Sequence, residues 1–158
     1  MDDRIANFML LAAKFEFFLV NENNDFAHID GITGAVHGVN WDRVGNSLER
    51  TNPFDGFDFK GYGFEVFKQT VPMFLKYDQH GQLKWDSEEI EISSWAELLG
   101  RSYAQLRNNV AHGNKAQLAA PFRQGKTEEF LVAGENLIHF VANVFGGKYI
   151  LTNEVYFH

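Results

Sequence analysis

The sequence predicts an all-α fold, a helical bundle of about four to five helices with one short β-hairpin. Long segments repeat apolar side chains at helical spacing, and one pair of short segments has the composition and turn of a hairpin. The chain has 158 residues, so we expect residues 1–158 to form a single domain that buries a core without disulfides. Its 16 Phe residues supply large apolar areas for that core.

The first helix is expected from Asp2 to Asn21. Polar side chains stack on one side of it at about 100° per residue, and most others are apolar, which predicts a largely buried helix. The polar stripe is Asp3, Asn7, Lys14 and Asn21, and the expected buried positions are Ile5, Phe8, Met9, Leu10, Leu11, Phe15, Phe17 and Phe18. Glu16 lies roughly opposite the polar stripe, where a carboxylate is costly unless it is paired. The candidate partners are an arginine, Arg101 or Arg107, or a tryptophan.

The segment after the first helix is expected to be less regular. Residues 22–40 are rich in Asn, Gly and Asp and predict a loop. A short helix is expected over 41–50, and Asn52-Pro53 stops it. The Phe- and Gly-rich segment 54–70 predicts no more than a helical turn or two, over 64–70.

A hairpin is expected after Pro72. Residues 73–77 and 82–85 form its strands, and Asp78-Gln79-His80-Gly81 forms its turn, because the glycine suits a position with positive φ. This hairpin is the β-structure that the sequence predicts, and it lies directly before the clearest helix of the chain.

That clearest helix begins at a capping signature. Ser94 precedes Glu97 by three residues, which is the spacing of a capping box, and Gly113 is expected to end the helix. Its apolar stripe is Trp95, Leu98, Leu99, Ser102, Leu106 and Val110. A linker with Pro121 and Gly125 follows, then a last helix from Thr127 to Phe145 that Gly146-Gly147 ends, then an extended tail over 148–158.

Composition and charge narrow the function classes. The chain has no cysteine, which excludes disulfides, thiolate zinc sites and a cysteine nucleophile and fits a cytoplasmic protein. Its longest apolar run, 8–20, is interrupted by charges and is too short to span a bilayer, and the N-terminus lacks a signal peptide. A net charge of −7 argues mildly against non-specific nucleic-acid binding and predicts that any such binding falls steeply with salt.

The best candidate for chemistry is the end of the capped helix, where Arg107, Asn108 and His112 fall within six residues. Asn108 and His112 are four residues apart and share a helix face, and the long Arg107 side chain can swing toward them. A guanidinium binds the non-bridging oxygens of a phosphate and stabilises the charge that develops there, and an imidazole transfers protons near neutral pH. In RNA the 2′-hydroxyl is an internal nucleophile, so this trio suits phosphodiester cleavage without a metal ion.

A plainer interpretation stays open at this point, because Arg and His at a helix C-terminus also complement the helix dipole. A metal site is not expected: His28, His37, His80 and His158 lack ligand spacing, and His139 lies on a polar face. The basic residues Lys115, Arg123 and Lys126 follow the trio and are either RNA-backbone contacts or ordinary surface charges.

The same residues resemble a known signature. An arginine, a polar residue, three further residues and then His-Gly is the pattern of the HEPN superfamily (higher eukaryotes and prokaryotes nucleotide-binding domain), and it stands here as Arg107, Asn108, His112 and Gly113. Its place late in a penultimate long helix also matches. Three further segments resemble one bacterial branch: Lys14-Phe15-Glu16-Phe17-Phe18, Asn40-Trp41-Asp42-Arg43 and Gly81-Gln82-Leu83-Lys84-Trp85.

The resemblance implies an endoribonuclease that needs no metal or cofactor and works as a homodimer, with the motifs of two subunits in one cleft. It assigns the catalytic positions to Arg107, His112 and Asn108, with Glu16 and Asn109 in support. Such proteins often act as toxins, which implies an antitoxin or another partner from a neighbouring gene. The alternative is a non-catalytic HEPN-like module that binds RNA, nucleotide or a partner protein.

Overall fold

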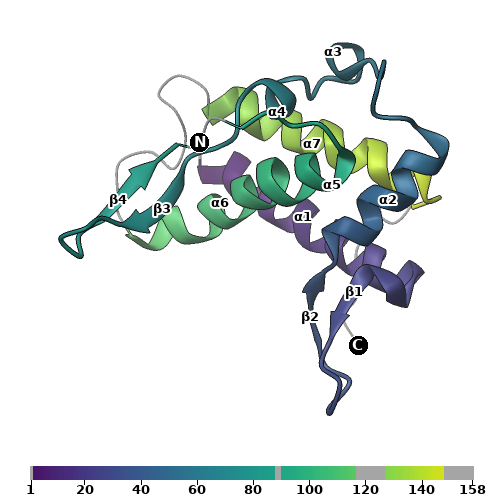
Figure 1. The fold of residues 1–158 in the computed structure, drawn as a ribbon, viewed down its shortest axis with the longest axis horizontal. Helices are drawn as coiled ribbons and strands as arrows, with labels where there is room; N and C mark the ends of the chain where they lie inside the picture. The colour runs from purple at the N-terminus through teal and green to yellow at the C-terminus, as the bar shows by residue number, and fades with distance from the viewer. Residues whose placement is uncertain (1, 88–89, 117–126, 148–158) are drawn as a thin grey trace.

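The computed structural model describes residues 2–87, 90–116 and 127–147, with side chains at 3–87, 90–111 and 128–147. This part of the chain is mostly helical and carries two small antiparallel hairpins that project from the helical body in different directions (Figure 1). The elements are α1 (Asp2–Glu22), the 3₁₀ turn η1 (Asn24–Phe26), β1 (Ala27–Ile29), β2 (Val36–Val39), α2 (Trp41–Thr51), α3 (Phe59–Tyr62), α4 (Val66–Gln69), β3 (Phe74–Tyr77), β4 (Leu83–Asp86), α5 (Trp95–Glu97), the π-helical turn η2 (Leu98–Tyr103), α6 (Ala104–Ala116) and α7 (Thr127–Val144).

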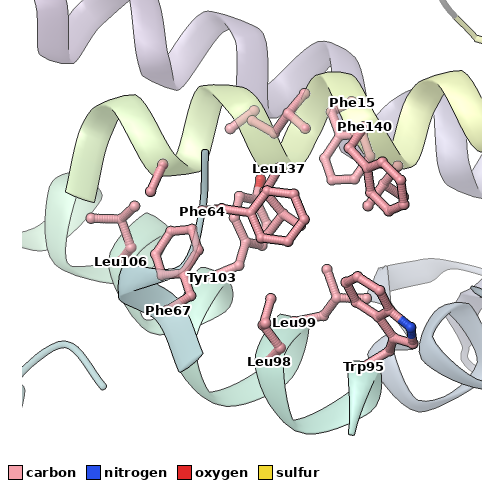
Figure 2. Packing of buried hydrophobic residues seen from close by; sticks show 14 of the residues in the cluster. Phe15, Phe64, Phe67, Trp95, Leu98, Leu99, Tyr103, Leu106, Leu137 and Phe140 are labelled. Carbon is pink, nitrogen blue, oxygen red and sulfur yellow. The ribbon is translucent and has the colours of Figure 1, made fainter. Parts of the chain in front are cut away.

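The helical body is built around α1, α6 and α7, with α2, α4 and α5 packed against it. Its core is aromatic. Rings from the Phe-rich middle of the chain pack against Trp95 and Phe140 (Figure 2), and the ring centroids of Trp95 and Phe140 are 5.7 Å apart. The largest fully buried side chains are Phe8, Phe15, Leu19, Leu48, Phe64, Phe67, Ile92, Trp95, Leu98, Leu99, Tyr103 and Phe130. These side chains exclude water from the face of α6 that is turned toward α1 and α7.

The expected capped helix is one continuous helix made of α5, η2 and α6. Ser94 caps it: the Ser94 hydroxyl accepts a hydrogen bond from the Glu97 amide at 3.1 Å, as the capping box predicts. The expectation that Gly113 ends this helix is wrong, because α6 continues to Ala116. A glycine costs about 1 kcal/mol in a helix relative to alanine and does not by itself end one. The π-helical turn inside the helix carried no signal in the sequence.

The expected hairpin is confirmed as β3 and β4, with Phe74 opposite Asp86 and Tyr77 opposite Leu83. A second hairpin, β1 with β2, replaces the loop predicted over 22–40, so the fold is mixed and dominated by helices rather than purely α. Its strands have three and four residues, too few for an alternation to show in the sequence. The Asp30 carboxylate starts its turn by accepting hydrogen bonds from the amides of Ile32 and Thr33 at 2.7 and 2.9 Å.

The Phe-rich middle contains more helix than expected. The helical turn expected over 64–70 is confirmed as α4, and α3 is an additional helix before it, which Gly63 ends at φ 84°. Long-range hydrogen bonds hold this segment in place. The Ser102 hydroxyl donates to the Phe67 carbonyl at 2.8 Å, and the Trp95 indole donates to the Asn52 carbonyl at 2.6 Å. No sequence pattern marks these bonds, because their partners lie 35 and 43 residues away.

The first and last helices follow the predicted ranges to within one residue. Gly146 ends α7 in the left-handed conformation at φ 79°, as the Gly-Gly pair predicts. On α1 the polar stripe faces outward, but Leu10 and Phe17 are 54% and 46% exposed, so the expectation that they are buried is wrong. They alternate with exposed Ala6 and Ala13, and these four residues are called the α1 seam below.

None of the described helices is both long and apolar enough to span a membrane.

Candidate functional site

The site begins with an ion pair between α1 and α6. The Nε of Arg107 donates to Oε2 of Glu16 at 3.0 Å across 91 residues of sequence, so Arg107 rather than Arg101 is the partner of Glu16. The two side chains differ in exposure, because Glu16 is 16% exposed and Arg107 is 41% exposed. The carboxylate therefore anchors the inner edge of a guanidinium whose outer part reaches solvent.

Burial controls the electrostatics of this pair. It raises the pKa of Glu16, and the charge and the hydrogen bond of Arg107 lower it without bringing it back to its ordinary value. Tyr103 packs beneath the pair, with its ring edge-on to Phe15 at 5.9 Å and to Trp41 at 5.3 Å. Complete burial, and secondarily the Glu16 charge, raise the pKa of Tyr103 well above its usual range. The rings of Phe15, Trp41 and Tyr103 therefore exclude water from the inner edge of the site.

Asn108 lies at the outer edge of the site. Its side chain is exposed, and its Oδ1 accepts a hydrogen bond from Nη1 of Arg107 at 3.3 Å. Arg107 has five N–H donors, and this bond and the Glu16 bond hold two of its three nitrogens. The guanidinium is thus oriented by two neighbours while it stays accessible to an anion from solvent.

His112 lies on α6, four residues after Asn108, and its side chain is outside the described residues, as is that of Lys115. Arg123 and Lys126 lie outside the described residues altogether. The length of α6 tests the plainer interpretation, in which Arg107 complements the dipole at the end of the helix. Arg107 stands nine residues before Ala116, the last residue of α6, whereas the dipole acts within the last turn of a helix. Helix capping therefore does not account for Arg107.

Asn109 does not join the exposed group. Its side chain is 3% exposed, its Nδ2 donates to the Met73 carbonyl at 2.6 Å, and its Oδ1 accepts from Nε2 of Gln105 at 2.7 Å. These bonds fix the start of β3 against α6. The structure places Asn109 on the side of α6 opposite Glu16, apart from Arg107 and Asn108, and the supporting role expected of it stays a prediction.

A groove that no sequence pattern predicted lies beside the helix made of η2 and α6, which is called the motif helix, and the groove is called the β3 groove. It measures about 380 Å³ and is lined by Val71, Phe74, Leu75, Ile90, Gly100, Arg101 and Gln105. Arg101, Gln105 and Asn108 are spaced by four and three residues, which is the one sequence signal that links this groove to the site. A second hollow, of about 390 Å³ between α4 and α7, is lined by three glutamates, Glu65, Glu128 and Glu129, and one lysine, Lys60, and this excess of negative charge disfavours anions.

In the described part of the chain, no cluster of three His, Asp or Glu side chains is placed to hold a metal ion. The functional groups at the site are the positioned guanidinium of Arg107 and the exposed amide of Asn108, and His112 follows them on α6. Comparison with protein-family models, curated proteins and solved structures finds no match to this chain.

Proposed function

We propose that this protein is a metal-independent endoribonuclease of the HEPN type. The observation that carries the proposal is the state of Arg107, which is anchored by the half-buried Glu16 at 3.0 Å, oriented by Asn108 and still 41% exposed. A surface arginine with a purely structural role has no need of a carboxylate that is costly to bury. An arginine that binds phosphate does need such an anchor, because its fork of donors must be oriented before the substrate arrives.

The proposed reaction uses the 2′-hydroxyl of RNA as the nucleophile. Its oxygen bonds to the adjacent phosphorus, the bond to the 5′-oxygen breaks, and the products are a 2′,3′-cyclic phosphate and a 5′-hydroxyl. Arg107 stabilises the negative charge on the non-bridging oxygens, and His112 transfers a proton as general acid or base. Asn108 and Glu16 are positioning residues that hold the guanidinium.

The proposal includes a homodimer, and the α1 seam is the surface that suits it. Ala6, Leu10, Ala13 and Phe17 alternate small and large side chains at spacings of four, three and four. When two such helices pack antiparallel about a two-fold axis, each large side chain faces a small one, which is how packed helix layers interdigitate. Ala13 and Glu16 are three residues apart and are neighbours on α1, so a second copy on the seam lies beside the Arg107 site.

The decisive experiment is RNA cleavage by the purified protein in EDTA. We expect products with 2′,3′-cyclic phosphate ends, and we expect His112→Ala to reduce cleavage by about 10²- to 10⁴-fold. His139→Ala is the matched control, because His139 is exposed on α7, away from the site. Activity that survives His112→Ala unchanged contradicts the mechanism. RNA binding without cleavage favours the non-catalytic module instead.

The dimer is tested separately by sedimentation. Leu10→Glu places a charge in the α1 seam and is expected to give monomers with little cleavage activity, whereas Ile32→Glu, which places the same charge at a 97% exposed apolar position outside the seam, leaves both unchanged. A wild-type protein that is monomeric and fully active rules out the shared cleft.

A further inference from the structure

We propose that the β3 groove is a subsite that binds one base of a single-stranded RNA, across α6 from the phosphate held at Arg107. The inference rests on the proposed function and adds to it a second contact with the substrate. It arises from three features of the described residues: the shape of the groove, the chemistry of its two edges, and its register along the motif helix.

The groove has the size and walls that a base requires. Its volume of about 380 Å³ is within the range of small-ligand sites, and four of its seven lining residues are the apolar Val71, Phe74, Leu75 and Ile90. Phe74 is half-buried at the start of β3. A ring at the wall of an open groove is a stacking platform, and stacking on an aromatic ring accepts any of the four bases.

The opposite edge is polar and comes from the motif helix. Arg101 is exposed on the π-helical turn η2, where a guanidinium can stack on a base or bind its phosphate. Gln105 is held by Asn109 through its Nε2, and its amide also carries an acceptor oxygen that suits the N–H groups of a base. π-Helical turns are rare and occur frequently at functional sites. The groove therefore combines an apolar wall with a cationic and hydrogen-bonding edge.

The register connects the groove to the site. Gln105 precedes Asn108 by three residues of α6, which is about 4.5 Å along the helix axis. Asn108 in turn holds Arg107. A strand whose phosphate lies on Arg107 can cross the exposed face of α6 at Asn108 and place a base further along the strand in the groove on the other side of the helix. The hollow between α4 and α7 is as large, but its lining carries three glutamates and one lysine, and this excess of negative charge repels a phosphate backbone.

The test measures binding of a five-nucleotide 2′-O-methyl RNA, which lacks the nucleophile and is not cleaved, with each position in turn made abasic. We expect one abasic position to weaken binding to the wild-type protein by about ten-fold, as the loss of one stacked base does. Phe74→Ala is expected to weaken binding of the intact RNA by a similar factor. In the Phe74→Ala variant, the same abasic position is expected to weaken binding no further. The stacking between the base and the ring is already lost when either partner is removed.

Controls separate this effect from misfolding and from general charge. Phe74→Trp keeps the stacking surface and is expected to retain affinity, and Tyr77→Ala removes a 71% exposed ring from the same strand without touching the groove. Arg101→Ala is expected to weaken binding more than Arg50→Ala, which removes an equal charge at another exposed position.

The outcomes also separate this proposal from the proposed function. Cleavage in EDTA with additive effects of Phe74→Ala and the abasic position overturns the base subsite and leaves the ribonuclease standing. Base-dependent binding through Phe74 without cleavage supports the subsite and overturns the ribonuclease. Absence of binding by the wild-type protein overturns the subsite.

Discussion

The two sides of α6 treat neighbouring polar residues in opposite ways. Toward β3, Asn109 is buried, and its amide is held at both ends by the Met73 carbonyl and Gln105. Toward α1, Arg107 is anchored at one edge by Glu16 and stays half-exposed, next to the exposed Asn108. Asn108 and Asn109 are adjacent in sequence, yet only one of them is available to a ligand.

The difference shows that the buried residues of a polar cluster on a helix have to be separated from the exposed ones before the cluster is interpreted as a site. A buried amide with both ends bonded stabilises the fold, because a lost partner leaves a polar group unpaired away from water. An exposed guanidinium that is held at one edge, as that of Arg107 is, is oriented to bind a ligand from solvent. Substitutions on the two sides of α6 test this division.

Arg107→Lys tests the exposed side and has the largest expected effect. Lysine carries the charge but has a single nitrogen, so it cannot reach Glu16 and Asn108 and also present a fork to phosphate. We expect cleavage to fall by about 10²- to 10³-fold, the range for loss of a stabilising group in a transition state. Single-turnover cleavage in EDTA measures it, with Arg50→Lys as the control. Retention of full activity in Arg107→Lys contradicts the bidentate role.

Asn109→Ala and Asn108→Ala form the sharpest pair. Asn109→Ala leaves the Met73 carbonyl and Gln105 without their partner, and we expect it to lower the free energy of unfolding by about 1–3 kcal/mol. Asn108→Ala is expected to change stability by no more than about 0.5 kcal/mol, because its side chain is exposed, and to lower cleavage instead. Urea unfolding measures the stability of both variants, and cleavage rates measure their activity. Equal stability losses in the two variants contradict the division.

Glu16→Gln tests the anchor through its pH dependence. The pKa of Glu16 is raised in the folded state, so the folded protein holds that proton to higher pH than the unfolded chain does. Wild-type stability relative to Glu16→Gln is therefore expected to fall as the pH rises from the ordinary carboxyl pKa, about 4.3, through the folded one. Urea unfolding across this range measures the trend, and Glu22→Gln at an exposed position of α1 is the control. A difference that grows in favour of the wild type contradicts the burial of Glu16.

Tyr103→Phe has the smallest expected effect. The Tyr103 hydroxyl is buried and has no hydrogen-bond partner among the described residues, so its removal is expected to be neutral or stabilising by up to about 1 kcal/mol. The raised pKa of Tyr103 predicts that wild-type stability falls above the ordinary tyrosine pKa of about 10, where the unfolded chain ionises first. Thermal unfolding shows both effects, with Tyr62→Phe at an exposed ring as the control. Clear destabilisation by Tyr103→Phe means that the hydroxyl has a partner.

Local signals predicted much of the fold. The Ser94 cap, the Gly81 turn and the glycines after α7 located a helix start, a hairpin and a helix end, because each depends on neighbouring residues alone. The same kind of signal failed at Gly113, where a weak local preference did not end α6. It also failed at the β1–β2 hairpin, whose strands are too short to show a period.

Local sequence patterns already place Arg107, Asn108 and Asn109 in succession on a helix and Glu16 on an apolar face of another helix. Long-range packing sets which arginine contacts Glu16, which asparagine is buried, and where the groove beside the motif helix forms. The reason is that periodicity and capping are local, whereas these contacts join residues 36 to 91 positions apart. Their geometry is set by how the helices and the β3–β4 hairpin pack around the aromatic core.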